Sequence, residues 1–295
     1  MKLSQLYDQI IRFGRDADPR GSRAARIDSY SDTALLYGNP DTEVSKIMVG
    51  IDIEVPELLL ADKLRKKRGL DLVLAHHPEG RAWAALHRVM SLQADMLIKI
   101  GVSPAVARGM IEDRASEVER RLLPQNHMRS VDAARLLDIP FACAHTPADN
   151  HAFTYIKGLM EKERPKTVQD ILDILLEIPE YKYAQKENAG PCIIAGSPRR
   201  AAGKVFVEMT GGTEGPAGIY DKVSKTGVRT LVSMHLSEEH LKKVKDASLN
   251  VVIAGHISSD TLGVNLLLDR IERSGRLETI DCSGFRRVRR TKKGL

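Results

Sequence analysis

Three separate segments of the chain have the pattern of a short, buried strand that ends in histidine. The first ends in the pair His76 and His77, the second in His145 and the third in His256, while a weaker fourth copy ends in His235. Parallel strands finish at the same edge of a sheet, and open α/β sheets place their ligand sites at that edge. The pattern therefore predicts an α/β fold whose strand ends bring these imidazoles together.

Two of the three segments also carry an acid four residues after the histidine. Asp149 follows His145 at this spacing, and Asp260 follows His256. Imidazole and carboxylate groups together form the ligand set of a divalent transition metal. We therefore predict a metal site at this edge, with the adjacent pair at the first strand end turned toward two nearby ions.

Each motif also has an ordinary explanation. One histidine of the pair His76 and His77 could lie in the core and the other on the surface. Asp260 could simply stabilise the start of a helix, where negative charge is favoured, with Ser258 or Ser259 as the cap. These explanations are independent of one another and do not predict a shared edge, whereas a metal site accounts for all the motifs together.

The order of expected elements favours layered helices around a largely parallel or mixed sheet. Residues 46–53 form an expected strand and residues 56–68 a helix closed by Gly69, after which the first histidine strand completes a strand–helix–strand unit. Residues 81–137 are rich in helical patterns, with Ser103 and Ser130 as expected caps. This block is longer than a crossover requires and predicts a helical insertion.

We expect two α/β subdomains with the metal site between them, at the carboxyl ends of the strands. The predicted division of the chain is an N-terminal part of the metal-binding core, a middle α/β subdomain and a C-terminal part that completes the core: residues 1–150, 151–244 and 245–295.

Composition narrows the cellular setting. No apolar run in the 295 residues approaches the roughly 20 needed to span a bilayer, so no membrane partner is expected. The cysteines Cys143, Cys192 and Cys282 lie far apart and form no C-x-x-C pair. This spacing argues against a disulfide framework and a thiolate zinc site, and favours a reducing compartment. We predict a cytoplasmic protein.

The formal net charge is +6, and much of the excess lies in the C-terminal segment 286–293. Such a segment could contact a nucleic acid or phosphate, or it could be a solvated, partly disordered tail, which is the commoner case. No aromatic residues interleave with these charges to stack on bases, so a nucleic-acid partner is not expected.

Taken together, the motifs resemble a known family. The His76-His77-Pro78 segment, the His-Thr-x-x-Asp segment that ends at Asp149 and the Gly-His-x-x-Ser-acid segment that ends at Asp260 look like those of the dinuclear-metal family called NGG-one-interacting-factor-three-like, or GTP cyclohydrolase I type 2-like. Residues 33–62 also resemble its N-terminal pattern. The resemblance covers residues 1–80 and 236–295, and the middle matches only loosely.

The resemblance implies an α/β fold, a homo-oligomer that can be a hexameric ring, and two divalent ions such as zinc, iron or manganese. The ligands it implies are His76, His77, Asp149, His256 and Asp260. The chain departs from the family pattern at Asp260, where the family usually has glutamate, and in the longer helical block after His77. The shorter carboxylate leaves open whether one or two ions bind.

The sequence supports two functional hypotheses. The first is a metal-dependent hydrolase acting on an anionic, possibly nucleotide-like substrate, which the positive net charge and the glycine-rich segment 211–215 favour. His145 is then a candidate acid or base, or a contact that orients a ligand. The alternative is a non-catalytic metal-binding scaffold, a metal store or a regulatory partner.

Overall fold

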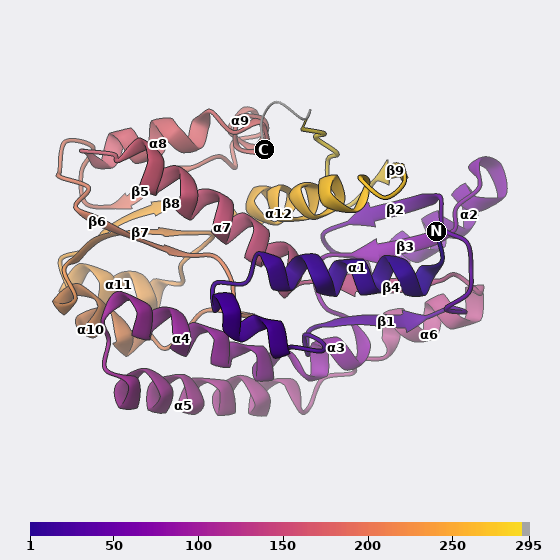
Figure 1. Ribbon diagram of the computed structural model, residues 1–295, viewed down its shortest axis with the longest axis horizontal. Coiled ribbons are helices and arrows are strands. Elements are labelled where there is room, and N and C mark those ends of the chain that lie inside the picture. The colour runs from indigo at the N-terminus through magenta and orange to yellow at the C-terminus, as the bar shows by residue number, and fades with distance from the viewer. Residues whose placement is uncertain (291–295) are drawn as a thin grey trace.

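A computed structural model describes residues 1–290 and contains two mixed, mostly parallel sheets (Figure 1). The first sheet has the order β1 (Thr33–Tyr37), β4 (Phe141–Ala144), β3 (Leu72–Ala75), β2 (Lys46–Gly50) and β9 (Glu278–Asp281). The second has the order β5 (Cys192–Ala195), β8 (Asn250–Ile253), β7 (Val228–Ser233) and β6 (Lys204–Glu208). The edge strands β1 and β5 are antiparallel to their neighbours, and the other pairs are parallel. The predicted α/β class is confirmed.

The first sheet is covered by helices on both faces, which is why its inner strands β3 and β4 are apolar and buried along their whole length. On one face, Ile47 and Val49 pack with α1 (Leu3–Asp16) and α12 (His256–Ile271). On the other face, Met48 packs with a cluster that includes residues of three helices: α2 (Val55–Arg68), α3 (Gly80–Ala84) and α6 (Arg129–Leu137). The alternation along β2 thus divides its side chains between two cores.

The second sheet belongs to the largest core. Its helices are α4 (Ser91–Ile100), α5 (Pro104–Leu122), α7 (Thr146–Glu163), α8 (Val168–Leu176), α9 (Pro179–Lys186), α10 (Tyr220–Lys225) and α11 (Glu238–Asp246). Short 3-10 turns lie at η1 (Gly21–Arg26), η2 (Leu86–Met90) and η3 (Ala217–Ile219).

Helices α7 and α12 pack against each other between the two sheets (Figure 1). Their contact is close at Gly263, where an added Cβ would lie 2.4 Å from the carbonyl oxygen of Ala148. A glycine at this point lets the two backbones approach. Both helices begin beside a strand-end histidine, so their packing brings His145 and His256 toward each other.

The histidine strands do not share one sheet edge, and this part of the prediction is wrong. Strands β3 and β4 are neighbours in the first sheet, whereas β7 and β8 are neighbours in the second. After β4, the long helix α7 carries the chain away from the first sheet, and β5 to β8 pair with one another before β9 returns to pair with β2. The carboxyl ends of both pairs meet between the sheets, as the two-subdomain prediction requires. The division at residues 150 and 244 stays a prediction, although β8 pairs with strands of the middle segment.

The predicted helical block is present as α3 to α6, but two predicted caps are wrong. Ser103 caps α5, with its hydroxyl accepting from the backbone of Val106 at 3.5 Å, whereas α6 begins before Ser130. Helix α12 begins at His256 and not after Ser259, because Gly255 adopts a φ of 102° that turns the chain into the helix at once. The Ser259 hydroxyl donates back to the carbonyl of Gly255 at 2.5 Å.

The described part of the C-terminal segment, residues 286–290, is not a solvated tail. Arg287 is buried against Asp269 at 2.6 Å and Glu272 at 2.9 Å, and Arg290 pairs with Glu180 at 2.7 Å. Lys292 and Lys293 lie outside the described residues. These arginines neutralise carboxylates of the same chain, which leaves less of the basic excess for a polyanion. Within residues 1–290, no helix combines the length and the apolar character that a membrane crossing requires.

Candidate metal centre

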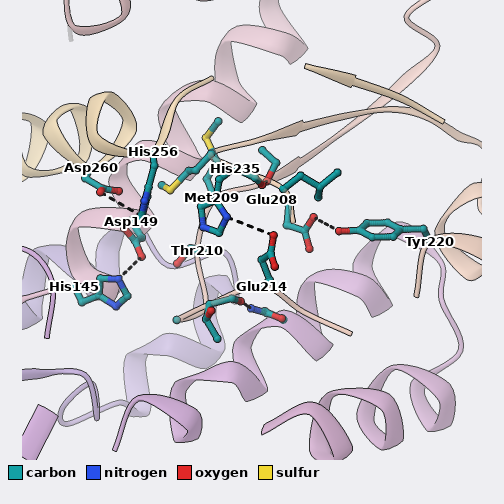
Figure 2. Close-up of a pocket in the computed structure, with 16 residues that line it drawn as sticks. His145, Asp149, Glu208, Met209, Thr210, Glu214, Tyr220, His235, His256 and Asp260 are labelled. Atoms are coloured by element: carbon teal, nitrogen blue, oxygen red, sulfur yellow. Dashed lines mark hydrogen bonds and ion pairs between the residues drawn. The ribbon is translucent and has the colours of Figure 1, made fainter. Parts of the chain in front are cut away.

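All six predicted site residues lie together between the two sheets. His76 and His77 follow β3, His145 precedes α7, and His256 is the first residue of α12. The two acids lie one turn further along these helices: Asp149 on α7 and Asp260 on α12. Figure 2 shows His145, Asp149, His256 and Asp260 close together at the starts of the two helices. His256 and Asp260 therefore share one helix face, which differs from the predicted split between a strand end and a helix start.

Asp260 lies at the middle of the cluster. Its Oδ1 is 3.4 Å from Nε2 of His76, and its Oδ2 is 3.4 Å from Nε2 of His77 and 3.5 Å from Nε2 of His256. The side chain is 1% exposed, and neither oxygen has a hydrogen-bond partner among the described residues. One carboxylate thus turns each oxygen toward a different set of imidazoles.

Asp149 lies beside the same imidazole that Oδ1 of Asp260 faces. Its Oδ1 lies 3.4 Å from Nε2 of His76, and its Oδ2 lies 3.7 Å from Nε2 of His145. In the part of the chain that the structure describes, Oδ1 of Asp149 and Nε2 of His76 also lack hydrogen bonds. Buried polar atoms without partners are costly, so this arrangement fits a cation that the atoms would surround.

The side chains form three groups whose ligand atoms lie within 4.8 Å of one another. They are His76, Asp149 and Asp260; His77, His256 and Asp260; and His76, His77 and His145. The first two share only Asp260. Nitrogen and oxygen donors in such groups suit borderline divalent ions, so the His and Asp groups are positioned to bind metal.

The second ring nitrogen of three histidines is held in place. Nδ1 of His76 lies 3.1 Å from the carbonyl of Ala144, Nδ1 of His77 lies 2.6 Å from Asp52, and Nδ1 of His145 lies 2.9 Å from Asp32. An acceptor at Nδ1 keeps a ring proton there, which directs Nε2 into the cluster and makes it the nitrogen that binds a metal once its own proton is lost. This orientation of Nε2 is the one that a metal ligand requires.

Sequence reasoning missed the roles of Asp32 and Asp52. Asp52 follows β2 just as His76 follows β3, so its place at a strand end was visible in the sequence. Asp32 precedes the antiparallel edge strand β1 and carried no comparable pattern. It is fully buried and also accepts from the hydroxyl of Thr146 at 2.6 Å, which fixes the start of α7 beside His145.

Replacing Asp52 by asparagine is expected to weaken metal binding about 10–100-fold, because an amide no longer fixes the His77 ring as the carboxylate does. Competition with a chromophoric chelator measures this affinity. The matched control is Asp113→Asn, which removes an exposed carboxylate from α5 and should leave the affinity unchanged. Equal affinity in Asp52→Asn and the control would show that His77 needs no such support.

Burial and mutual contact shift the pKa values of the cluster. Burial raises the pKa of Asp149 to about 7 and lowers that of His76 to about 4. For His77, burial alone would lower the pKa, but Asp260 and Asp52 outweigh it and raise it to about 10. Burial opposes ionisation of Asp260, yet His76 and His77 hold the pKa of its carboxyl below the usual range.

Two cavities border the cluster. One, of ≈ 530 Å³, is lined by His77, His145 and His256 together with Trp83 and Arg129 of the helical insertion. The other also borders His145 and His256, as well as both cluster acids, and it extends past Glu208, Glu214 and Tyr220 (Figure 2). The cluster is therefore buried but has space beside it for a small molecule.

The fourth histidine strand also reaches this site. His235 follows β7, and its ring centroid lies 4.7 Å from that of His256. The sequence showed no acid at the four-residue step, but Glu214 supplies one from a distant loop, with Oε1 3.4 Å from Nδ1 of His235. Only the tertiary structure could identify that partner.

No family model and no curated protein matches the chain. Among solved structures, the NIF3 superfamily protein from Sphaerobacter thermophilus has a TM-score of 0.78 and 26% identity, covering 97% of this chain and 99% of that one.

Two more distant structures show similarity of fold alone. Reduced HcgD from Methanocaldococcus jannaschii has a TM-score of 0.55 and 18% identity, over 95% of this chain and 97% of that one. The protein TTHA1606 from Thermus thermophilus has a TM-score of 0.53 and 14% identity, again over 95% and 97%. The two-sheet architecture, the buried His/Asp cluster and the full-length similarity agree with the family that the sequence motifs resemble, and the chain has the NIF3 superfamily fold.

Proposed function

We propose that this protein binds two divalent metal ions and uses them to hydrolyse a small anionic substrate. The observation that carries the proposal is the position of Asp260. Its two oxygens face separate imidazole groups, and both oxygens are buried without a hydrogen-bond partner among residues 1–290. A carboxylate in this position is suited to bridge two ions.

His76 and Asp149 would hold one ion with Oδ1 of Asp260, and His77 and His256 would hold the other with Oδ2. The side chain of Asp260 is one methylene shorter than the glutamate usual in the family. It nevertheless lies within 3.5 Å of an Nε2 on both sides, because α12 begins at His256 and brings Asp260 deep into the cluster. Zinc, iron and manganese all suit such a donor set.

Two divalent ions bound here would lower the pKa of a bound water and stabilise developing negative charge on a substrate. His145 is the residue best placed to move a proton at Nε2, because Asp32 binds its Nδ1 and its ring borders both cavities. Burial alone would lower the pKa of His145, but the nearby carboxylates of Asp149 and Asp32 raise it. A protonated His145 could therefore serve as an acid and its neutral form as a base.

An anionic substrate is supported by the ions themselves, which would bind and polarise its oxygen atoms. Their four positive charges would balance the four carboxylates of Asp32, Asp52, Asp149 and Asp260. Arg129 borders the larger cavity, and the backbone at Gly212 and Thr213 borders both cavities. That cavity, at ≈ 530 Å³, lies within the ~300–1,000 Å³ range typical of small-molecule sites. Space of this kind favours an enzyme over a metal store. A homo-oligomer, including a hexameric ring, stays a prediction.

The test begins with metal analysis of protein purified without added metal. A panel of phosphoester, nucleotide and cyclic-amide substrates is then screened with and without chelator. We expect about two ions per chain, and turnover that a chelator removes and that His77→Ala abolishes. His87→Ala is the matched control, because His87 lies outside the cluster on η2 and should retain turnover.

Stoichiometric metal without turnover on any substrate class would contradict the hydrolase and favour a metal-binding scaffold. Turnover that persists in the metal-free protein would contradict the role of the metal centre itself.

A further inference from the structure

A separate cleft of ≈ 950 Å³ lies along the later part of α7. Its walls come from α7, α4 and β6. Figure 1 shows α7 and α4 on either side of the second sheet. Within the described residues, it shares no lining residue with the cavities beside the metal cluster. The cleft is therefore a distinct candidate site, which the proposed hydrolase does not use.

One wall of this cleft is an unpaired sheet edge. Strand β6 lies at the edge of the second sheet and, in the part of the chain that the structure describes, pairs with β7 alone. Across residues 1–290, no backbone hydrogen bond joins β6 to an element other than β7. An edge of this kind presents free N–H and C=O groups, and extended peptides bind such edges by adding a strand. The cleft includes Lys204, Val205, Phe206 and Val207 of this edge strand.

The inner surface of the cleft is apolar. Its floor is formed by the largely buried side chains of Phe153 and Met160 of α7, Met96 of α4 and Phe206 of β6, each 5–6% exposed. Side chains alternate in direction along a strand, so a peptide added to β6 could direct every second side chain toward this surface. Apolar residues at alternate positions of the peptide would fit there.

The rim of the cleft is basic. Four cations line it, Lys99, Lys157, Arg164 and Lys204, together with one carboxylate, Glu161, which pairs with Lys157 at 2.5 Å. Lysine on an edge strand also discourages aggregation, which is an alternative reason for Lys204. That reason does not extend to Lys99 on α4, to Lys157 on α7 or to Arg164 at the end of α7.

Two of the cations are held in place by backbone carbonyls. The ammonium group of Lys204 donates to the carbonyl of Ile100 at 2.9 Å, and that of Lys99 donates to the carbonyl of Pro19. These bonds fix the positions of both charges, and no carboxylate of residues 1–290 forms an ion pair with either. An incoming acidic group would then lose less entropy in ordering them.

We propose that this cleft binds an extended, acidic segment of a partner protein, which adds to β6 as a strand. Its apolar side chains would pack on Phe153 and Phe206, and its carboxylates would face the four cations of the rim. The unpaired edge favours a peptide over a small amphipathic anion, because only a peptide backbone satisfies a row of N–H and C=O groups.

The test measures the fluorescence anisotropy of a labelled peptide of alternating glutamate and valine, titrated with the full-length protein. The double variant Lys157→Glu/Arg164→Glu is expected to weaken binding by about tenfold or more, since it replaces attraction by repulsion. The matched control Lys63→Glu/Lys67→Glu makes the same charge change on exposed residues of α2 and should leave the affinity within about twofold. Equal losses in both variants would overturn the proposal in favour of non-specific attraction.

Strand addition itself is tested with two further peptides. One peptide is N-methylated at the alternate backbone amides that point to one side of the extended chain. The other is N-methylated at the amides that point to the opposite side. Only the edge that faces β6 should be sensitive, with a loss of about tenfold. Equal affinity of both methylated peptides would overturn strand addition.

Three other outcomes would also overturn the proposal. The first is that the peptide does not bind. The second is that laurate binds the protein and displaces the peptide with one-to-one stoichiometry, while N-methylation of the peptide has no effect. The third is that the protein self-associates in sedimentation and that Lys157→Glu/Arg164→Glu abolishes this self-association. The second would assign the cleft to an amphipathic anion, and the third to a second copy of the chain.

Discussion

Asp260→Asn is expected to remove both metal ions together and to weaken their binding by more than about 100-fold. This loss exceeds the one expected for a residue that only orients a metal ligand, such as Asp52. The amide keeps the shape of the side chain but offers one oxygen where the carboxylate offers two. Since Oδ1 faces His76 and Oδ2 faces His77 and His256, one half of the site loses its shared oxygen and the other keeps only a neutral amide oxygen in place of a carboxylate. Equilibrium dialysis followed by elemental analysis measures the ion count directly.

Three variants make this result specific. His256→Ala removes a ligand from one group only and should leave one ion bound. Asp260→Glu restores the longer carboxylate that is usual in the family and should keep both ions. Asp113→Asn changes an exposed carboxylate on α5 and should behave as the unaltered protein. Two ions retained in Asp260→Asn, with unchanged affinity, would show that Asp260 does not bridge them.

Metal affinity is expected to fall steeply as the pH is lowered, by about 10³-fold between pH 8 and pH 6. In the metal-free protein the pKa of His77 is raised to about 10, so its proton must leave whenever a metal binds near neutral pH. The pKa of Asp149 is raised to about 7, so below that pH a second proton competes. A raised pKa keeps the ligand protonated over a wider range, and affinity therefore rises as pH increases toward each pKa.

Two measurements check this dependence. Competition with a chelator of known pH behaviour gives the affinity at pH 6, 7 and 8. Calorimetry in buffers of different ionisation enthalpy gives the number of protons released, which should be about one at pH 8 and should approach two at pH 6. A flat affinity over this range would mean that neither His77 nor Asp149 loses a proton to the metal.

The candidate site was largely predictable from the sequence because it is built at the ends of regular elements. A short apolar run followed by histidine identifies a strand and its end, and the acid four residues later lies one helical turn further on. This local rule applies to His145 with Asp149 and to His256 with Asp260, on α7 and α12. The helix boundary at His256 was wrong, because the start of α12 depends on the conformation of Gly255.

The sequence by itself determined the α/β class, the histidine-ended strands and the residues that the structure gathers. Only the tertiary structure decided that the strands belong to two sheets, that α7 and α12 meet at Gly263, and that Asp32, Asp52 and Glu214 accompany the histidines. The physical reason is the distance along the chain over which each interaction acts. Hydrophobic periodicity and caps act within a few residues, whereas sheet partners and carboxylate contacts join residues far apart in the chain, where packing alone selects them.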